Sequence, residues 1–260
     1  MLKNKLKRYI PQVIIDLVTY VKSFLEYLKI KEVLACNRIL KNIFKNEAVY
    51  IIGNGPSLNN FELQSIHGQC VITMNHFELH PHKDKFKIVA HCIGEPYNSE
   101  TWEDPMLMIN GVEADTYWVN ADALTFFSKK NIKNIHYYLP GVRSTAEILN
   151  GMDLTRVALQ YQSTSQMAIN IALYFGFKKI YLLGLDHDWL VTRGYSPHFY
   201  DDTEDIPKIN MSMWTYTEMI KISLNLFETY AKIKKNSETV NAKIINLSSP
   251  SYLDVFPTKM

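Results

Sequence analysis

Acid–base chemistry is concentrated in one polar segment that follows the apolar run 180–185. The segment begins with two carboxylates two positions apart and continues into a loop that contains glycine and proline. Its reactive side chains are those of Asp186, His187, Asp188, Arg193, Tyr195 and His198. A histidine titrates near neutral pH and can accept a proton from a hydroxyl nucleophile. His198 is therefore our first choice of general base and His187 the second, the alternative being loop histidines bonded to neighbouring carboxylates.

The pattern Asp186-His187-Asp188 also permits metal chemistry. Two carboxylates facing an open loop could hold Mg²⁺ or Mn²⁺ against a diphosphate. Such short patterns also arise by chance. Two hypotheses stay open: a reaction that requires no cofactor, and one in which Asp186 and Asp188 bind the metal. The other histidines have no spacing to cysteine or glutamate that would define a zinc site.

A second candidate site is the turn after the apolar run 49–52. The turn consists of Gly53, Asn54, Gly55, Pro56 and Ser57. We expect the glycines to take positive φ and to let a ligand approach the backbone, and Pro56 to begin a helix. A glycine turn before a helix N-terminus can bind an anion through free backbone N–H groups. The alternative is a strand-to-helix turn without a ligand, because the motif is neither GxGxxG nor a phosphate loop.

The rest of the chain alternates between short apolar runs and helical patterns. We predict strands at 70–74, 87–91, 117–120, 135–139, 179–185 and 243–246, and helices at 121–129, 165–175 and 214–234. This alternation is typical of an α/β, Rossmann-like, doubly wound and mostly parallel sheet. Ligands of such sheets lie at the carboxyl ends of the strands. Asn75, Asn120 and Asp186 each follow or end a strand, so we expect one polar cleft there.

The first 46 residues differ in charge from the rest of the chain. They hold ten basic and three acidic residues, a net charge of +7, whereas the whole chain of 260 residues carries +2. Residues 47–260 therefore carry −5. We expect a basic amphipathic helical extension over 1–46 and one catalytic domain over 47–260, with a lid at 187–212. The charge of the domain gives no support for a nucleic-acid partner.

Apolar residues recur at helical spacing from Ile10 to Leu28, which predicts a helix with one continuous apolar face. Charged residues interrupt the run, so it does not resemble a membrane span. With the basic segment 3–8 before it, the helix resembles those that lie on anionic membranes. Packing on the domain, or on a second subunit of a homo-oligomer, is the open alternative. Three unpaired cysteines and no visible secretory signal predict a cytoplasmic protein, peripheral on the inner face of the cytoplasmic membrane where the helix meets lipid.

Two blocks of the sequence carry a family likeness. The first is IGNGPSL at 52–58, with Met74-Asn75 one strand later, and the second runs from 163 to 186. In this order they resemble the bacterial sialyltransferases of glycosyltransferase family 42. They also resemble the related family of motility-associated factors and hydroxymethylpterin diphosphokinases. Capsule and surface-polysaccharide biosynthesis proteins with a basic helical extension look similar too.

The resemblance implies a Rossmann-like fold of the glycosyltransferase A type. It also implies transfer of a sialic-acid-like nonulosonic acid, with inversion, from a CMP-activated donor to a surface glycan acceptor. The implied nucleotide contacts are those of Asn54, Ser57, Asn75, Thr164 and Ser165. The segment 163–165 could instead only cap the helix that follows it.

The chain departs from the family pattern where the chemistry is decided. The family places a tyrosine two residues after its strand-end aspartate, where this chain has Asp188. Tyr195 and Arg193 could serve the leaving phosphate instead, and His198 would replace a histidine of a longer lid. The alternatives are a Mg²⁺-dependent diphosphokinase that uses Asp186 and Asp188, and a non-catalytic nucleotide-binding or scaffold subunit of a polysaccharide assembly complex.

Overall fold

The architecture is that of a computed structural model, which describes residues 12–94, 105–130, 132–141, 151–192, 198–200 and 214–258. Its centre is a seven-stranded sheet in which every neighbouring pair of strands is parallel. The strands are β1 (Ala48–Ile52), β2 (Cys70–Met74), β3 (Lys87–Ile93), β4 (Tyr117–Asn120), β5 (Ile135–Tyr138), β6 (Lys179–Leu183) and β7 (Lys243–Asn246). The chain is therefore an α/β protein with a doubly wound parallel sheet, as predicted.

The strand order is β5-β4-β3-β2-β1-β6-β7. The chain builds outward from β1 to β5 on one side and then crosses to the other side of β1 for β6 and β7. Ala48 of β1 lies opposite Lys179 of β6, and Ile52 lies opposite Leu183. The order thus reverses between β1 and β6. In open α/β sheets this reversal marks the ligand crevice, so the turns after β1 and β6 lie where a ligand is expected.

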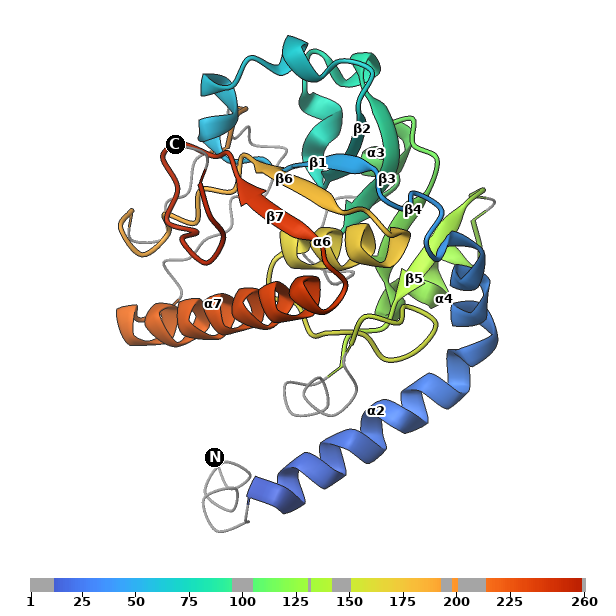
Figure 1. Cartoon of the computed structure of the whole chain (residues 1–260). Helices are drawn as coiled ribbons and strands as arrows, with labels where there is room; N and C mark the ends of the chain where they lie inside the picture. The colour runs from blue at the N-terminus through green and yellow to red at the C-terminus, as the bar shows by residue number, and fades with distance from the viewer. Residues whose placement is uncertain are drawn as a thin grey trace.

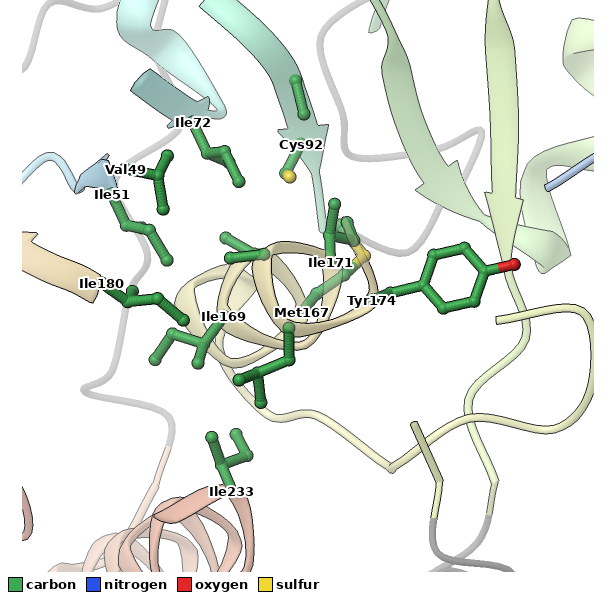
Figure 2. Packing of buried hydrophobic residues seen from close by; sticks show 14 of the residues in the cluster. Val49, Ile51, Ile72, Cys92, Met167, Ile169, Ile171, Tyr174, Ile180 and Ile233 are labelled. Atoms are coloured by element: carbon green, nitrogen blue, oxygen red, sulfur yellow. The ribbon is translucent and has the colours of Figure 1, made fainter. Parts of the chain in front are cut away.

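One face of the sheet is covered by α6 (Thr164–Phe175), on which α7 (Tyr216–Thr239) packs in turn (Figure 1). Every residue of α6 is buried. Figure 2 shows Ile51 and Ile72 of the sheet on one side of α6 and Ile233 of α7 on the other. A helix that is apolar all round requires neighbours on both sides. The first turn of α6 is therefore held rigidly at the edge of the crevice.

The opposite face is covered by short elements. They are the 3₁₀ helices η3 (Pro56–Asn60), η4 (Leu63–Ile66), η5 (His76–Leu79) and η6 (Lys83–Lys85), with α3 (Pro105–Asn110), η7 (Ala121–Ala123) and α4 (Leu124–Phe127). Leu58, Ile66 and Phe77 from these elements pack on Ile52 and Val71. Side chains of successive residues in a strand point to opposite faces of the sheet, so Ile51 and Ile52 belong to different layers of the core.

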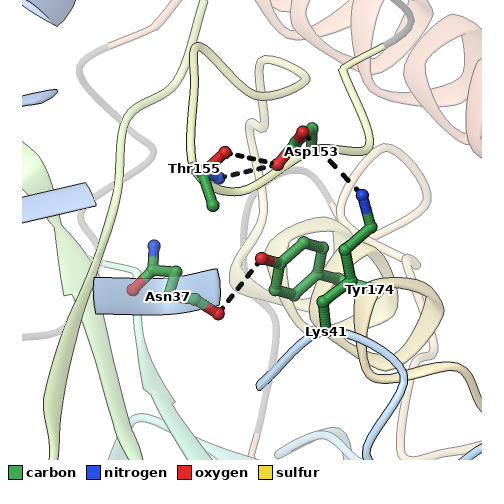
Figure 3. A network of polar contacts seen from close by, with 5 residues as sticks. All are labelled: Asn37, Lys41, Asp153, Thr155 and Tyr174. Carbon is green, nitrogen blue, oxygen red and sulfur yellow. Dashed lines mark hydrogen bonds and ion pairs between the residues drawn. The ribbon is translucent and has the colours of Figure 1, made fainter. Parts of the chain in front are cut away.

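The N-terminal helix α2 (Gln12–Ala35) contacts the domain at the C-terminal end of the helix, and its N-terminal part extends away from the sheet (Figure 1). It continues into η2 (Cys36–Leu40), where Asn37 is fully buried. The Asn37 amide donates to the carbonyl oxygens of Tyr137 (3.0 Å) and Leu154 (2.7 Å). The Tyr174 hydroxyl donates to the Asn37 carbonyl at 3.1 Å (Figure 3). These bonds fix the base of α2 to β5 and α6.

Within the described residues, none of the helices has the length and apolar character needed to cross a membrane.

The predicted strands all exist, and helices 165–175 and 214–234 correspond to α6 and α7. Two further predicted helical segments exist but are shorter or of another helix type. The segment after the glycine turn is a five-residue 3₁₀ helix, η3, and 121–129 is divided into η7 and the four-residue α4. A 3₁₀ helix forms hydrogen bonds between residues three apart, so it suits short segments whose two ends are held by the rest of the fold.

Candidate functional site

The turn at 53–57 is closed on the protein itself. The N–H of Gly53 donates to Leu183 O at 2.8 Å, and that of Gly55 donates to Gly184 O at 2.9 Å. The N–H of Ser57 donates to Asp186 Oδ2 at 2.9 Å, and the Ser57 hydroxyl donates to Asp186 Oδ1. The expectation of an anion site formed by free backbone N–H groups is therefore wrong for these three residues, because their donors already have acceptors.

The two glycines are required for packing rather than for positive φ. Gly55 has a φ of −68°, and Gly53 is not among the described glycines with positive φ. A Cβ on Gly55 would lie 2.7 Å from the Asp186 carboxyl group and 2.8 Å from Gly184 O. The glycines therefore allow the ends of β1 and β6 to approach each other. Pro56 begins η3, as predicted, although η3 is a five-residue 3₁₀ helix.

Two adjoining cavities lie at the carboxyl ends of the strands. The smaller, of about 150 Å³, is lined by Asn54, Gly55, Asp186, His187 and His198, among others. The larger, of about 410 Å³, is lined by Gly94, Asn120, Gln160 and Tyr161, among others. Both are also lined by Asn75, Ser163, Thr164 and Trp189. We call the two together the cleft. It gathers most of the predicted site residues at the edge where β1 and β6 diverge.

Asn54 lines the smaller cavity and has one acceptor atom without a partner among the described residues. Its Nδ2 donates to Met74 O at 3.3 Å, whereas its Oδ1 is buried without a hydrogen-bond partner among the described residues. A buried acceptor without a partner costs about 1–3 kcal/mol. Such an atom in a cavity wall is suited to a ligand hydroxyl or amino group.

Asn75 connects β2 to the first turn of α6. It has a φ of +46°, an unusual conformation that asparagine tolerates better than most residues. Its Nδ2 donates to Thr164 Oγ1 at 3.2 Å, and its Oδ1 accepts from the Gly94 N–H at 3.3 Å. Strained backbone of this kind gathers at functional sites.

The segment 163–165 does more than cap α6. Ser163 is the N-cap residue, yet its side chain makes no capping bond. Its hydroxyl lies 2.7 Å from that of Ser165, which lies 2.5 Å from the Tyr230 hydroxyl of α7. The capping alternative therefore does not describe these hydroxyl groups, which join a network across α6 and α7.

His187 ends that network. It has a φ of +51°, whereas the other described non-glycine residues with positive φ are asparagines. Its Nε2 lies 2.8 Å from the Tyr230 hydroxyl, and its Nδ1 is buried with no partner among the described residues. Burial lowers the pKa of His187 to about 4, so the ring is neutral at physiological pH. A neutral imidazole can accept a proton, but a pKa this far below neutral makes His187 a weaker general base than one that titrates near the operating pH.

His198 lies in the wall of the same cavity. Its ring stacks on Tyr200 with 4.8 Å between centroids, and the N–H of the next residue, Phe199, donates to Asn54 O at 2.9 Å. The histidine segment is thus attached to the glycine turn. Arg193 and Tyr195 lie outside the described residues, as does most of the predicted lid at 187–212.

The remaining predicted residues are placed as follows. Asn120 lines the larger cavity, where its Nδ2 donates to the Tyr161 hydroxyl at 2.9 Å. Burial raises the pKa of Asp186, and the hydrogen bonds from Ser57 oppose that shift. Asp188 lines neither cavity of the cleft. In the described part of the chain, no three His, Cys, Asp or Glu side chains are grouped to hold a metal ion.

Sequence reasoning missed Tyr161, Trp189 and Tyr230. Tyr161 lies in a segment without periodicity between β5 and α6, and Tyr230 has the spacing of a core residue in α7. Trp189 alone had a usable signal, because it is an aromatic residue directly after a strand-end polar cluster.

Comparisons with known proteins agree with this geometry at the level of the fold. No family model and no curated protein matches the chain. Among solved structures, the chain is similar to the sialyltransferase CstII from Campylobacter jejuni, solved in complex with a substrate analogue, cytidine-5'-monophosphate. The TM-score is 0.50, with 16% identity over 82% of this chain and 85% of that one.

A second similar structure is the MAf glycosyltransferase from Magnetospirillum magneticum AMB-1. The TM-score is 0.51, with 14% identity over 84% of this chain, which spans 34% of that protein. At these identities the likeness establishes a shared fold. The predicted resemblance to sialyltransferases and motility-associated factors is therefore confirmed for the fold.

Proposed function

We propose that the protein is a glycosyltransferase that uses a CMP-activated donor, most simply a sialic-acid-like nonulosonic acid, and transfers it with inversion to a surface glycan acceptor. The observation that carries the proposal is the buried, unpartnered Oδ1 of Asn54 in the wall of the cleft. It stands beside Asn75 and Thr164, in a fold shared with a sialyltransferase that was solved with CMP. The three free cysteines suit a reducing cytoplasm as the compartment.

The cleft has the chemistry of a nucleotide-sugar site. Amide and hydroxyl groups can recognise a pyrimidine and a ribose through hydrogen bonds alone. In the larger cavity these are Asn120, Gln160 and the Tyr161 hydroxyl, and Trp189 supplies an aromatic wall. We assign the base of the nucleotide to this cavity and its ribose to the junction with the smaller cavity, which Asn54 lines. The transferred sugar then lies in the rest of the smaller cavity, next to His187 and His198.

Inversion needs a single displacement. The acceptor oxygen forms a bond to the anomeric carbon as the bond from that carbon to the CMP phosphate oxygen breaks. The acceptor proton passes to a histidine, His198 in the first instance and His187 in the second. Arg193 and Tyr195 are the sequence-based candidates for meeting the charge of the released phosphate.

The proposed reaction does not depend on a metal. Both carboxylate oxygens of Asp186 accept hydrogen bonds from Ser57, so this side chain has a structural task that explains its position after β6. Mg²⁺ or Mn²⁺ bound by Asp186 and Asp188 is the alternative, and it accompanies the diphosphokinase hypothesis.

A thermal-shift experiment tests the proposal. CMP and a CMP-sugar should raise the melting temperature of the native chain without added metal, because a ligand that binds only the folded state stabilises it. The same shift should be lost in Asn54→Ala and kept in Asn60→Ala, whose amide bonds Ser249 O outside the cleft. Stabilisation by ATP only with Mg²⁺ would favour the kinase. No response to any nucleotide would favour a non-catalytic subunit.

A further inference from the structure

The outer side of α2 carries an unusually long exposed apolar surface. Seven large apolar side chains lie on it, each between 43% and 63% exposed: Ile14, Leu17, Val18, Val21, Phe24, Leu25 and Leu28. Their spacing of three and four residues places them on one side of the helix. We call this set the outer stripe. Single exposed apolar residues are common, but a contiguous patch marks an interaction site.

The opposite side of α2 is covered along the C-terminal half of the helix, from Ser23, which is 7% exposed, to Leu34. Leu34 is fully buried there, and Tyr27 and Ile30 pack against the same part of the core. Further toward the N-terminus the helix extends away from the sheet (Figure 1). The outer stripe therefore faces away from the domain, which excludes packing of this stripe on the described domain.

Basic residues border the outer stripe on both sides. Lys22 and Lys29, seven residues apart, follow the edge formed by Val18 and Leu25, and Lys31 follows Phe24 by seven residues on the other edge. All three lysines are exposed. Lysine side chains in this position can lie along apolar surface and direct their amines outward into a polar layer. The arrangement is that of a helix at a membrane interface.

The charges of α2 balance in number, with three lysines against Asp16, Glu26 and Glu32, so the basic surplus comes from the segment before the helix. Glu26 pairs with Lys29 at 3.0 Å from farther round the helix, and Glu32 lies beyond the end of the stripe, 3.8 Å from Lys31. The segment before α2 adds Lys3, Lys5, Lys7 and Arg8 without an acidic residue. A second copy of α2 packed on the stripe would bring lysine edges against lysine edges, which disfavours self-pairing. The charges fit an anionic partner.

We propose that the outer stripe and its lysine edges hold this protein on an anionic phospholipid membrane, with the stripe inserted at the boundary between headgroups and acyl chains. Basic residues near such a surface each add attraction of about 1 kcal/mol, and the buried apolar side chains add a term that salt does not screen. The proposal rests on α2 and on the basic residues that precede it in the sequence, and it is independent of the reaction in the cleft.

Flotation of the full-length chain with vesicles tests it. The chain should bind vesicles of phosphatidylglycerol mixed with phosphatidylcholine, and bind vesicles of phosphatidylcholine alone at least tenfold more weakly. The double variant Leu17→Gln/Leu25→Gln should lose binding. Ile39→Gln is the matched control, since Ile39 is 74% exposed and lies outside the stripe. Lys22→Gln/Lys29→Gln should weaken binding by about thirtyfold at low salt and by less at high salt.

Two results would overturn the proposal. One is equal binding to both kinds of vesicle, or binding that survives the loss of Leu17 and Leu25. The other is a chain that ignores vesicles but sediments as a dimer that Leu17→Gln/Leu25→Gln converts to a monomer. In that case the second copy is the occupant of the stripe. Circular dichroism and melting temperature of each variant confirm that the domain is folded, because the substituted side chains are exposed.

Discussion

The turn at 53–57 and the cleft beside it lie at the same edge of the sheet but use their polar atoms differently. In the turn, the N–H groups of Gly53, Gly55 and Ser57 all donate to acceptors at the end of β6 or on the segment directly after it. In the cleft, Asn54 Oδ1 and His187 Nδ1 are buried with no partner among the described residues. The backbone N–H groups of these three turn residues thus serve the structure, whereas the side chains of Asn54, in the same turn, and of His187 each keep one unpaired polar atom. The glycines of the motif serve the site by allowing two strand ends to approach each other.

The largest effect that this comparison predicts is on catalysis, at His198. Removing a positioned base typically lowers a rate by ~10²–10⁴-fold, because the protonated acceptor hydroxyl is a poor nucleophile. We expect His198→Ala to lose transfer in that range and to bind CMP like the native chain. His82→Ala is the control, because His82 is exposed and does not line the cleft. Steady-state rates and CMP binding by calorimetry give the two readouts.

Metal dependence is decided in the same assay. EDTA should leave transfer unchanged, and Asp188→Asn should have a mild effect. An EDTA-silenced enzyme in which Asp188→Asn is inactive and His198→Ala is active would contradict the base assignment. It would favour the reading in which Asp186 and Asp188 bind a divalent metal.

The second effect is on folding, at Gly55. A methyl group there would overlap the Asp186 carboxyl and Gly184 O, and overpacking of this kind costs about 1–3 kcal/mol. We expect Gly55→Ala to lower the melting temperature more than Gly68→Ala. Gly68 has a φ of +76° and nothing within 4 Å of an added Cβ, so its substitution measures backbone strain without overlap. If Gly55→Ala has native stability but does not bind CMP, the turn contacts the nucleotide directly.

The strands were predictable because each is a short apolar run that ends at polar or glycine residues. The geometry of the turn was not, because its partner Asp186 lies 129 residues away in the chain. The same limit applies to His187, whose neutral state depends on burial beneath α7 and on Tyr230, 43 residues later. Apolar spacing also gave similar predictions for α2 and α6. Only the tertiary structure shows that α6 is buried on all sides and that α2 exposes its stripe.

The third effect is on CMP affinity, at Asn54, which belongs to the turn and lines the cleft. If Asn54 Oδ1 accepts a hydrogen bond from the nucleotide, its loss should weaken CMP binding by about tenfold to a hundredfold. Folding should change little, since the side chain makes one long bond to Met74 O, at 3.3 Å. Titration calorimetry on Asn54→Ala and the control Asn60→Ala measures this. Equal affinity in both variants would remove Asn54 Oδ1 from the nucleotide site.

The smallest effect is on the pH dependence of stability and compares His187 in the cleft with His136 beneath η2. Burial lowers the pKa of each to about 4, below the value near 6.5 that an unfolded chain has. Between pH 6.5 and about 4 the unfolded state therefore binds protons that the native state does not. The free energy of unfolding should fall as pH falls through this window, by up to about 1.4 kcal/mol per pH unit for each histidine.

Two variants measure the two histidines separately. His187→Asn retains a side chain that tolerates the φ of +51° and can bond Tyr230, and His136→Asn retains a polar partner for Asn37. Each should flatten the pH dependence of urea unfolding by about one proton. The raised pKa of Asp186 changes stability with pH in the opposite direction. This contribution is the same in the variants and in the native chain, so it cancels when their slopes are compared.

If bound CMP covers the unpartnered Nδ1 of His187, it should change the pH dependence of stability of the native chain and of His136→Asn but not that of His187→Asn. If His187→Asn leaves the pH dependence of unfolding unaltered, His187 takes up protons equally in the folded and unfolded states. His187 and His198 would then both be solvent-facing candidates for the general base.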